Sequence, residues 1–242
     1  MLHCKTPAVI YERKYVPFWI LSSFKSGFIN TMGFLLTGEF VSHVTGFGTR
    51  VGITMGHQDF LFGFELLFIP VSFISGAIVT SFILDKKNLS GHSPPYYKVQ
   101  ALYTIILGII LLMGKLEWFS DKHSFGNDNF YTPVEVMTIF LLCFVCGLKN
   151  GLVAWTTYGK IRVTHLTGLS TDIGLNFIRM FNPDRLSERF KESSYVNFIR
   201  IFILFSFSSG AFVSALVFPR MGFEGPWFPL IICGHFVGGF LL

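Results

Sequence analysis

The chain has 242 residues, of which 51% are hydrophobic and only 14% are charged, and 30 of them are phenylalanine. A soluble domain has about 25% charged residues, because polar side chains must cover its surface. The low charge, with a net charge of +5 and a mean hydropathy of +0.56, excludes a disordered tail, a secreted disulfide scaffold and an ordinary cytosolic enzyme. The composition predicts an all-α, polytopic membrane protein that forms a single domain over residues 1–242.

Six apolar runs are expected to be transmembrane helices. They cover Val16–Leu36, Phe60–Leu84, Val99–Met113, Val134–Ala154, Val196–Phe218 and Trp227–Leu242. A span takes about 20 residues, so six spans use about half of the chain. The third and sixth runs are short and need flanking residues or a locally thinner bilayer. The first run has no small-residue cleavage site, so we expect a retained helix and no signal peptide.

The basic residues predict the orientation of these spans. One set of loops holds 13 of them: Lys5, Arg13, Lys14, Lys86, Lys87, Lys98, Lys160, Arg162, Arg179, Arg185, Arg189, Lys191 and Arg200. The alternate loops hold four: Arg50, Lys115, Lys122 and Arg220. Because Lys and Arg accumulate on the cytoplasmic side, both termini are expected in the cytoplasm. The charged segment 177–197 is expected to form a separate surface helix.

Three blocks occur twice in the same order. Gly27–Asn30 and Gly147–Asn150 both read G-x-x-N, and the blocks starting at His43 and His165 both read H-x-T-G-x-x-T-x-x-G. Ser75-Gly76-Ala77 is repeated as Ser209-Gly210-Ala211. The offsets are 120, 122 and 134 residues. We therefore expect repeat one at about 16–115 and repeat two at about 134–242. Three spans per repeat would make the two copies inverted, as in many secondary transporters.

The segments FKSGFINTMGFLLTGEFVSHVTGFGTRVG and GLKNGLVAWTTYGKIRVTHLTGLSTDIG resemble the YoaK family of bacterial integral membrane proteins. The chain departs from that pattern at Asn30, Phe47 and Lys149, where an acid, Asn and Gln are usual. The resemblance implies a six- or seven-helix protein of the bacterial inner membrane, and it implies no established chemistry.

Each H-x-T-G block is about 16 Å long as a helix, half of the hydrocarbon core. The blocks are therefore expected to form re-entrant or broken half-helices whose polar ends meet near the midplane, with Gly46, Gly48, Gly52, Gly168 and Gly174 allowing breaks or close approach. The candidate pathway residues in the blocks are His43, Thr45, Gly46, Thr49, His165, Thr167, Gly168, Thr171 and Asp172. Tight packing alone is the alternative.

Two intramembrane lysines, Lys25 and Lys149, are the most costly residues of the predicted spans. Each costs about 2.5–3.5 kcal/mol near mid-span, and no acid lies within a turn of either. An uncompensated pair of cations would suit an anionic substrate; the alternative is that they snorkel to the interface. Asn30 and Asn150 are more readily explained as hydrogen-bonding between helices.

Other polar groups leave alternatives open. His43 and His165 could contact a proton or substrate or be structural, and they are too few ligands for a metal. Arg50 and Asp172 could pair across the repeats as a gate, or could both face water. Cys143 and Cys146 are expected to be buried, inert thiols.

The sequence therefore predicts a secondary transporter of a small anionic solute, a carboxylate or a carboxylate-chelated metal, with its path at the repeat interface. The alternatives are a non-transporting membrane assembly protein and a passive channel. Nucleophile, zinc-protease, P-loop and dinucleotide motifs are all missing, so no enzyme activity, metal or cofactor is expected. The expected partners are the lipid bilayer and the solute, with no nucleic acid and with self-association left open.

Overall fold

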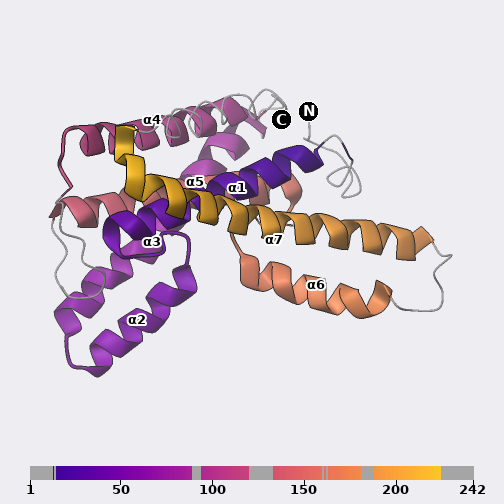
Figure 1. The fold of residues 1–242 in the computed structure, drawn as a ribbon, viewed down its shortest axis with the longest axis horizontal. Coiled ribbons are helices and arrows are strands. Elements are labelled where there is room, and N and C mark those ends of the chain that lie inside the picture. The colour runs from indigo at the N-terminus through magenta and orange to yellow at the C-terminus, as the bar shows by residue number, and fades with distance from the viewer. Residues whose placement is uncertain are drawn as a thin grey trace.

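The computed structural model describes residue 13 and residues 15–88, 94–119, 133–159, 161, 163–180 and 188–224. These residues form α-helices and one short 3-10 turn, and no strand occurs among them, which confirms the all-α prediction. The elements are α1 (Val16–Thr37), α2 (Val44–Gly56), α3 (Phe60–Asn88), α4 (Tyr96–Lys115), α5 (Pro133–Thr157), α6 (Leu166–Met180), α7 (Glu188–Met221) and η2 (Gly222–Glu224) (Figure 1).

The first five predicted runs lie within α1, α3, α4, α5 and α7, and the sixth, Trp227–Leu242, lies outside the described residues. Four helices are long and apolar enough to cross a membrane: Phe60–Asp85, Tyr96–Lys115, Pro133–Thr157 and Ser194–Glu224. Helix α1 has 22 residues but is not one of these four. Its serines, Lys25 and Asn30 are buried, so α1 needs less lipid-compatible surface than an outer helix.

Helix α7 is longer than its apolar run. It has 34 residues, about 51 Å of helix, and begins at Glu188. The charged segment expected as a separate surface helix is therefore, from Glu188 onward, the start of α7, and that prediction is wrong. Residues 181–187 lie outside the described part of the chain.

The two H-x-T-G blocks form the short helices α2 and α6, of 13 and 15 residues. These lengths correspond to about 20 and 23 Å, less than the hydrocarbon core. Each helix begins at the residue after its histidine, His43 or His165. Neither helix is broken at its T-G pair, so the glycines there do not interrupt the backbone.

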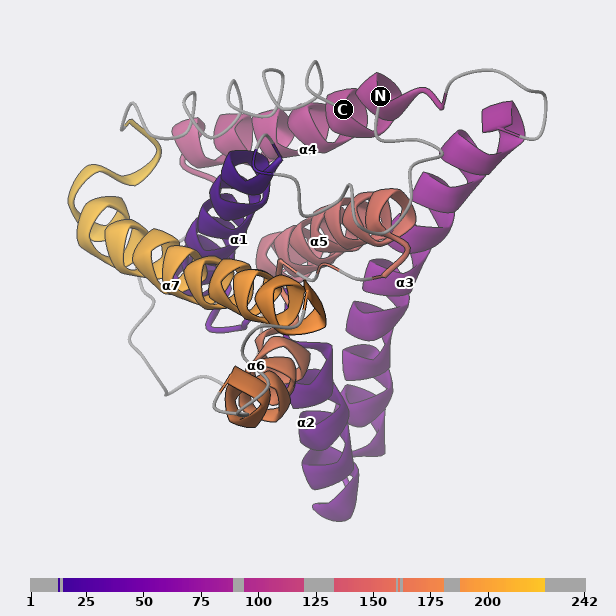
Figure 2. The ribbon, with the colours of Figure 1, turned by 90° about the vertical axis from the view of Figure 1, so that its right-hand side faces the viewer.

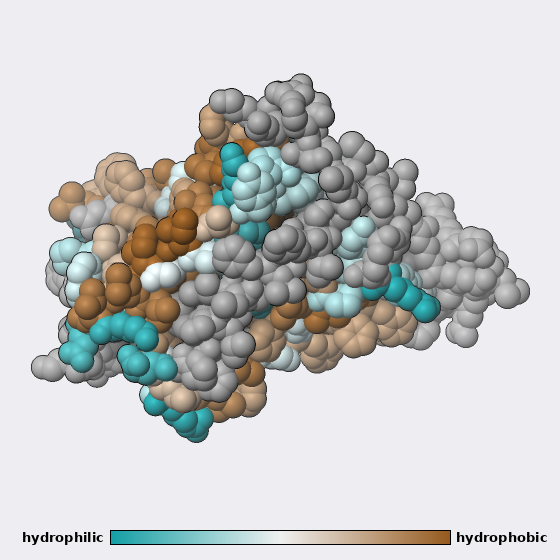
Figure 3. All heavy atoms as spheres, turned by 90° about the horizontal axis from the view of Figure 1, so that it is seen from above, coloured by the Kyte–Doolittle hydropathy of each residue, from teal (hydrophilic) through white to brown (hydrophobic). Residues whose placement is uncertain are grey.

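Helices α1 and α5 are the inner helices, and α3 and α7 lie outside them (Figure 2). In the most apolar stretch of α5, 67% of the residues are buried inside the protein, against 22% in the corresponding stretches of α3 and α7. Large apolar side chains cover the outer helices, including Phe68 and Phe82 on α3 and Phe205 and Phe212 on α7. In the view from above, much of the surface formed by the described residues is accordingly apolar (Figure 3). A surface of this kind needs lipid, which makes the chain a membrane protein.

Glycines allow the closest helix contact, between α1 and α7. The α carbon of Gly27 lies so near the carbonyl of Phe207 that any side chain would overlap it, and Gly210 lies in the same way against the carbonyl of Phe24. Ser206 Oγ adds a hydrogen bond to the Ile20 carbonyl at 2.7 Å. Small residues at such a crossing let two backbones meet.

The contact between α3 and α5 repeats the one between α1 and α7. Gly147 lies against the carbonyl of Phe73, and Gly76 against the carbonyl of Phe144. Ser72 Oγ donates to the Phe140 carbonyl at 2.8 Å. Every residue here is the repeat equivalent of one at the α1–α7 crossing, at the offsets of 120 and 134. The first helix of each repeat thus packs on the second long helix of the other, α1 on α7 and α5 on α3.

These crossings give a prediction for stability. We expect Gly147→Ala to destabilise the fold by about 1–3 kcal/mol, because the new methyl group overlaps the Phe73 carbonyl, a backbone atom that cannot turn away. Gly108→Ala in α4 is the control: its Cβ meets nothing within 4 Å, so the change should be neutral or stabilising by up to about 1 kcal/mol. Thermal unfolding in detergent measures both, and equal midpoints would contradict the crossing.

Candidate functional site: two buried lysines where α1 meets α5

Lys149 lies in the middle of α5 with only 7% of its surface exposed. Its ammonium donates a hydrogen bond of 2.6 Å to the main-chain carbonyl of Ser22 on α1. The hydroxyl of Ser26 donates to the same carbonyl at 3.0 Å. The charge of Lys149 is thus held by neutral groups of the neighbouring helix.

Lys25 lies on α1, three residues after Ser22, and is 6% exposed. It forms no hydrogen bond or ion pair with the described residues, and it lies near enough to Lys149 for the two positive charges to repel each other. Both lysines are buried, so neither follows the snorkelling alternative. The site is a pair of cations on adjoining helices that lacks a bonded carboxylate among the described residues.

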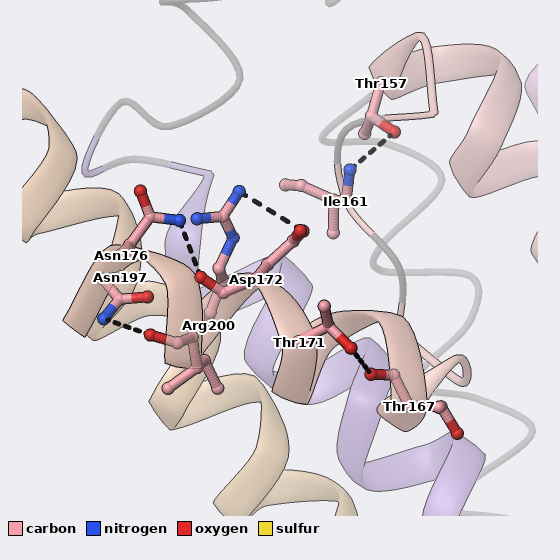
Figure 4. Close-up of polar contacts among 9 residues, drawn as sticks. Thr157, Ile161, Thr167, Thr171, Asp172, Asn176, Asn197 and Arg200 are labelled. Atoms are coloured by element: carbon pink, nitrogen blue, oxygen red, sulfur yellow. Dashed lines mark hydrogen bonds and ion pairs between the residues drawn. The ribbon is translucent and has the colours of Figure 1, made fainter. Parts of the chain in front are cut away.

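The two acids in or next to the repeated blocks, Glu39 and Asp172, pair with arginines and not with the buried lysines. Glu39 forms an ion pair with Arg50, and Asp172 forms one with Arg200 of α7 at 3.5 Å (Figure 4). Arg50 and Asp172 therefore do not pair with each other, so of the two alternatives for them the gate is wrong. Glu39 and Asp172 are each engaged by an arginine, so the buried lysines keep their charges uncompensated by them.

The polar face of α1 is bonded to the backbone of other elements. Ser23 is fully buried, and its hydroxyl lies 2.9 Å from the Ile203 carbonyl of α7 and 3.2 Å from the Val163 carbonyl. Hydroxyl groups that bond neighbouring carbonyls stabilise polar helices within an apolar environment. This packing holds the polar face of α1, with Lys25, inside the protein.

Asn30 and Asn150 have equivalent partners, but these are not on other long helices. Asn30 Oδ1 accepts hydrogen bonds from the amide and the hydroxyl of Ser42, at 3.0 and 2.8 Å. Asn150 Oδ1 accepts one from the hydroxyl of Thr164, the repeat equivalent of Ser42. The asparagines hold the segments that lead into α2 and α6. Sequence reasoning missed Ser42 and Thr164, although their equal place before the histidines is a usable signal.

The side chains of the H-x-T-G blocks point largely to the surface. His43, His165, Thr45, Thr49, Thr167 and Thr171 are exposed, and Gly46, Gly168 and Asp172 are half-buried. The hydroxyl of Thr49 bonds the Thr45 carbonyl at 3.2 Å, and that of Thr171 bonds the Thr167 carbonyl at 3.0 Å. Both hydroxyls serve their own helix. The buried lysines and these blocks are therefore separate features.

The glycines of the H-x-T-G blocks do not bring two helices into close contact. Gly48, Gly52 and Gly174 have no atom within 4 Å of an added Cβ, so the expectation of close approach there is wrong. A Cβ on Gly46 would meet the ring of His43 first, a neighbour in the same block. The glycines of the G-x-x-N and S-G-A blocks make the close contacts, because the long helices cross there.

Two polar contacts attach helix α6 to α7 (Figure 4). They are the Asp172–Arg200 ion pair and the contact of Asn197 Nδ2 with the Ile173 carbonyl at 3.4 Å. Asn176 Nδ2 donates to the Asp172 carbonyl at 2.7 Å within α6 itself. Helix α2 is bound differently, since Arg50 pairs with Glu39 in the segment before it.

The α6 fastening gives a second prediction. Arg200→Gln removes the pair with Asp172, which is worth about 0.5–1 kcal/mol at this partial exposure. Amide hydrogen exchange in α6 should accelerate about two- to fivefold while α2 stays unchanged. Arg220→Gln is the control, because Arg220 is exposed and, among the described residues, bonds its own helix at the Leu216 carbonyl. Unchanged exchange in α6 would show that the pair does not hold it.

The thiols of Cys143 and Cys146 are free and buried, as expected. Among the described residues no group of three or more His, Cys, Asp or Glu side chains could hold a metal ion. The chemistry that the described site offers is therefore electrostatic: two ammonium groups and neutral hydrogen-bonding groups in a dehydrated environment.

The resemblance to the YoaK family rests on the segments that hold the G-x-x-N and H-x-T-G blocks, and the G-x-x-N blocks also make the repeated helix crossings. Comparison with curated proteins gives no match, and comparison with solved structures gives none either. A family match does cover residues 18–238, nearly the whole chain, and agrees with that resemblance. The chain thus belongs to the family described as "Protein of unknown function (DUF1275)".

Proposed function

We propose that the protein is a secondary transporter that carries a small anion, a carboxylate or a carboxylate-chelated metal, past Lys25 and Lys149. The single observation that carries the proposal is the burial of both lysines on adjoining helices with no carboxylate bonded to either in the described chain. Buried charges are usually paired, because dehydrating a charge is costly. An anion between the helices would supply the missing countercharge.

The repeated contacts support two inverted three-span repeats. Gly27 with Phe207 corresponds to Gly147 with Phe73, so equivalent residues exchange partners. Reciprocal contacts of this kind are characteristic of a two-fold relation. With one span between α3 and α5, namely α4, the first helices of the repeats would cross the bilayer in opposite directions. We place both termini in the cytoplasm of a bacterial inner-membrane protein, following the distribution of basic residues.

One observation favours a second candidate, a membrane assembly component that transports nothing. Lys149 already has a hydrogen-bond acceptor in the Ser22 carbonyl, so it could serve only to hold α5 on α1. Under this alternative Lys25 needs no ligand, and the polar core merely joins helices. A passive channel is the third alternative, and it would give flux without saturation.

Uptake into proteoliposomes tests the proposal. Radiolabelled acetate, succinate and citrate, the last with and without Mg²⁺, are offered under a pH, sodium or potential gradient. We expect saturable uptake of at least one of them above protein-free vesicles. Folded, inserted protein that moves none of these anions under any gradient would overturn the proposal in favour of the assembly component.

A further inference from the structure

The helices pack into two bodies that do not coincide with the two sequence repeats. Helices α1 and α6 both pack on α7, whereas α2 and α5 both pack on α3. One body therefore holds α1 of repeat one with α6 and α7 of repeat two. The other holds α2 and α3 of repeat one with α5 of repeat two. Helix α4 packs mainly on α5, and its last turn meets Phe223 after α7.

The chain crosses between the bodies at two equivalent places. The segment between α1 and α2 and the segment between α5 and α6 each leave one body and enter the other. Left-handed backbone begins both segments, at Gly38 in the first and at Tyr158 and Gly159 in the second. Short, bent connectors of this kind can absorb a rotation between rigid parts.

The contacts within a body are much tighter than those between the bodies. Within each body, glycines bring the backbones of two helices into direct contact, at Gly27 and Gly210 in one and at Gly76 and Gly147 in the other. Between the bodies, α1 and α5 make a lighter contact. The hydrogen bond from Lys149 on α5 to Ser22 on α1 crosses it.

Building on the transport function proposed above, we propose that these interleaved bodies are the parts that move against each other, and that the Lys149–Ser22 bond is the tie between them which a carboxylate anion releases. The anion binds the ammonium groups of Lys25 and Lys149. A carboxylate is a stronger acceptor for an ammonium than a neutral carbonyl, because both partners of that hydrogen bond are charged. Lys149 therefore turns from Ser22 to the anion, and the bodies are free to rock.

Release of the tie by the anion couples binding to motion. A ligand shifts a conformational equilibrium only by its difference in affinity between the two states. Here the difference comes from Lys149, which has one acceptor in the tied state and a better one in the loaded state. The empty protein stays tied, so the bodies do not rock without cargo.

Spin labels at four exposed positions distinguish interleaved bodies from moving repeats. The positions are Leu21 on α1, Val71 on α3, Met137 on α5 and Phe205 on α7, which are 41–64% exposed. They are introduced as cysteines after Cys4, Cys143, Cys146 and Cys233 have been changed to alanine, in protein reconstituted into vesicles. Leu21–Phe205 and Met137–Val71 are pairs within a body, and Leu21–Val71 and Met137–Phe205 are pairs within a repeat.

On adding succinate or acetate, we expect the distances of the two within-body pairs to stay constant and those of the two within-repeat pairs to shift. The opposite pattern, or no shift in any pair, overturns the inference. The variant Lys149→Met tests the same point without a ligand. Because it lacks the bond to Ser22, its within-repeat pairs should show the shifted distances before any anion is added. Lys115→Met is the matched control. Lys115 is an exposed lysine whose contact, with the exposed Glu224, is 3.9 Å long.

Uptake by the same labelled proteins separates the two proposals. Saturable uptake with the opposite distance pattern keeps the transport function and overturns the interleaved bodies. The expected distance shift in Lys149→Met, with no uptake of acetate, succinate or citrate by the parent protein, keeps the interleaved bodies and overturns transport.

Discussion

Replacing Lys149 by methionine is expected to lower the uptake of the transported anion about tenfold to a hundredfold and at the same time to raise the thermal stability of the protein. The uptake falls because a charge-assisted hydrogen bond to the anion is lost, which is worth about 1.5–3 kcal/mol. The stability rises because a dehydrated charge is replaced by an apolar chain of similar length. Initial uptake rates per inserted protein and unfolding midpoints measure the two effects.

The combination of the two effects distinguishes a binding role from a purely structural one. A structural Lys149 would give no loss of uptake beyond that explained by insertion or folding. Lys149→Arg keeps the charge and should retain more uptake than Lys149→Met. Lys115→Met removes an exposed lysine and should leave both measurements unchanged. Full uptake by correctly inserted Lys149→Met would remove Lys149 from the pathway.

Lys25 allows a comparison within the same site. Lys25→Met should also lower uptake, and it should stabilise the fold more than Lys149→Met does. The reason is that Lys149→Met loses the bond to Ser22, whereas Lys25 has no bond among the described residues to lose. The same thermal unfolding series measures this order, and the reverse order would show that Lys25 has a stabilising partner.

Opposite labelling of two equivalent positions is the second large effect that we expect. Thr45 and Thr167 lie in the first turns of α2 and α6, are exposed, and correspond at the offset of 122. If the repeats are inverted, Thr45→Cys reacts with a membrane-impermeant maleimide from outside intact cells. Thr167→Cys then reacts only in inside-out vesicles. The expected difference is all or none, because each thiol opens to one aqueous side.

The choice of positions follows from the packing. Phe47 and Leu169 are the equivalent residues two places further along, and they are only 3% and 4% exposed, so a cysteine there would report burial and not sidedness. Labelling after permeabilisation is the control for reactivity. Reaction of both thiols from the same side would disprove the inverted arrangement, and with it the proposed path at a repeat interface.

The spans and short helices were predictable because their signals are local. The apolar runs are read directly from consecutive residues, and five of the six lie in described helices. The H-x-T-G blocks predicted two short helices because their repeated pattern is shorter than a span. The start of α7 was predicted as part of a separate surface helix, because the change from charged to apolar residues does not interrupt a helix and so gives no signal that the two parts are continuous.

The partners of the polar residues were not predictable, because they depend on which helices meet. Arg50 and Asp172 suggested a pair by their equivalent positions, but each has a nearer partner, in Glu39 and Arg200. The lysines could be recognised as costly from the sequence. Only the packing placed Lys149 against Ser22, 127 positions away along the chain.

The amino-acid sequence by itself determined the membrane class, the positions of most helices, the repeated blocks and the family, because each depends on composition or on patterns along the chain. The tertiary structure alone decided that α1 and α5 are the inner helices, that Gly27, Gly76, Gly147 and Gly210 make the close crossings, and that helices of both repeats share each body. The physical reason is that the sequence does not distinguish a glycine packed against another helix from a glycine on the surface. Their roles differ only once another backbone occupies, or leaves empty, the space beside them.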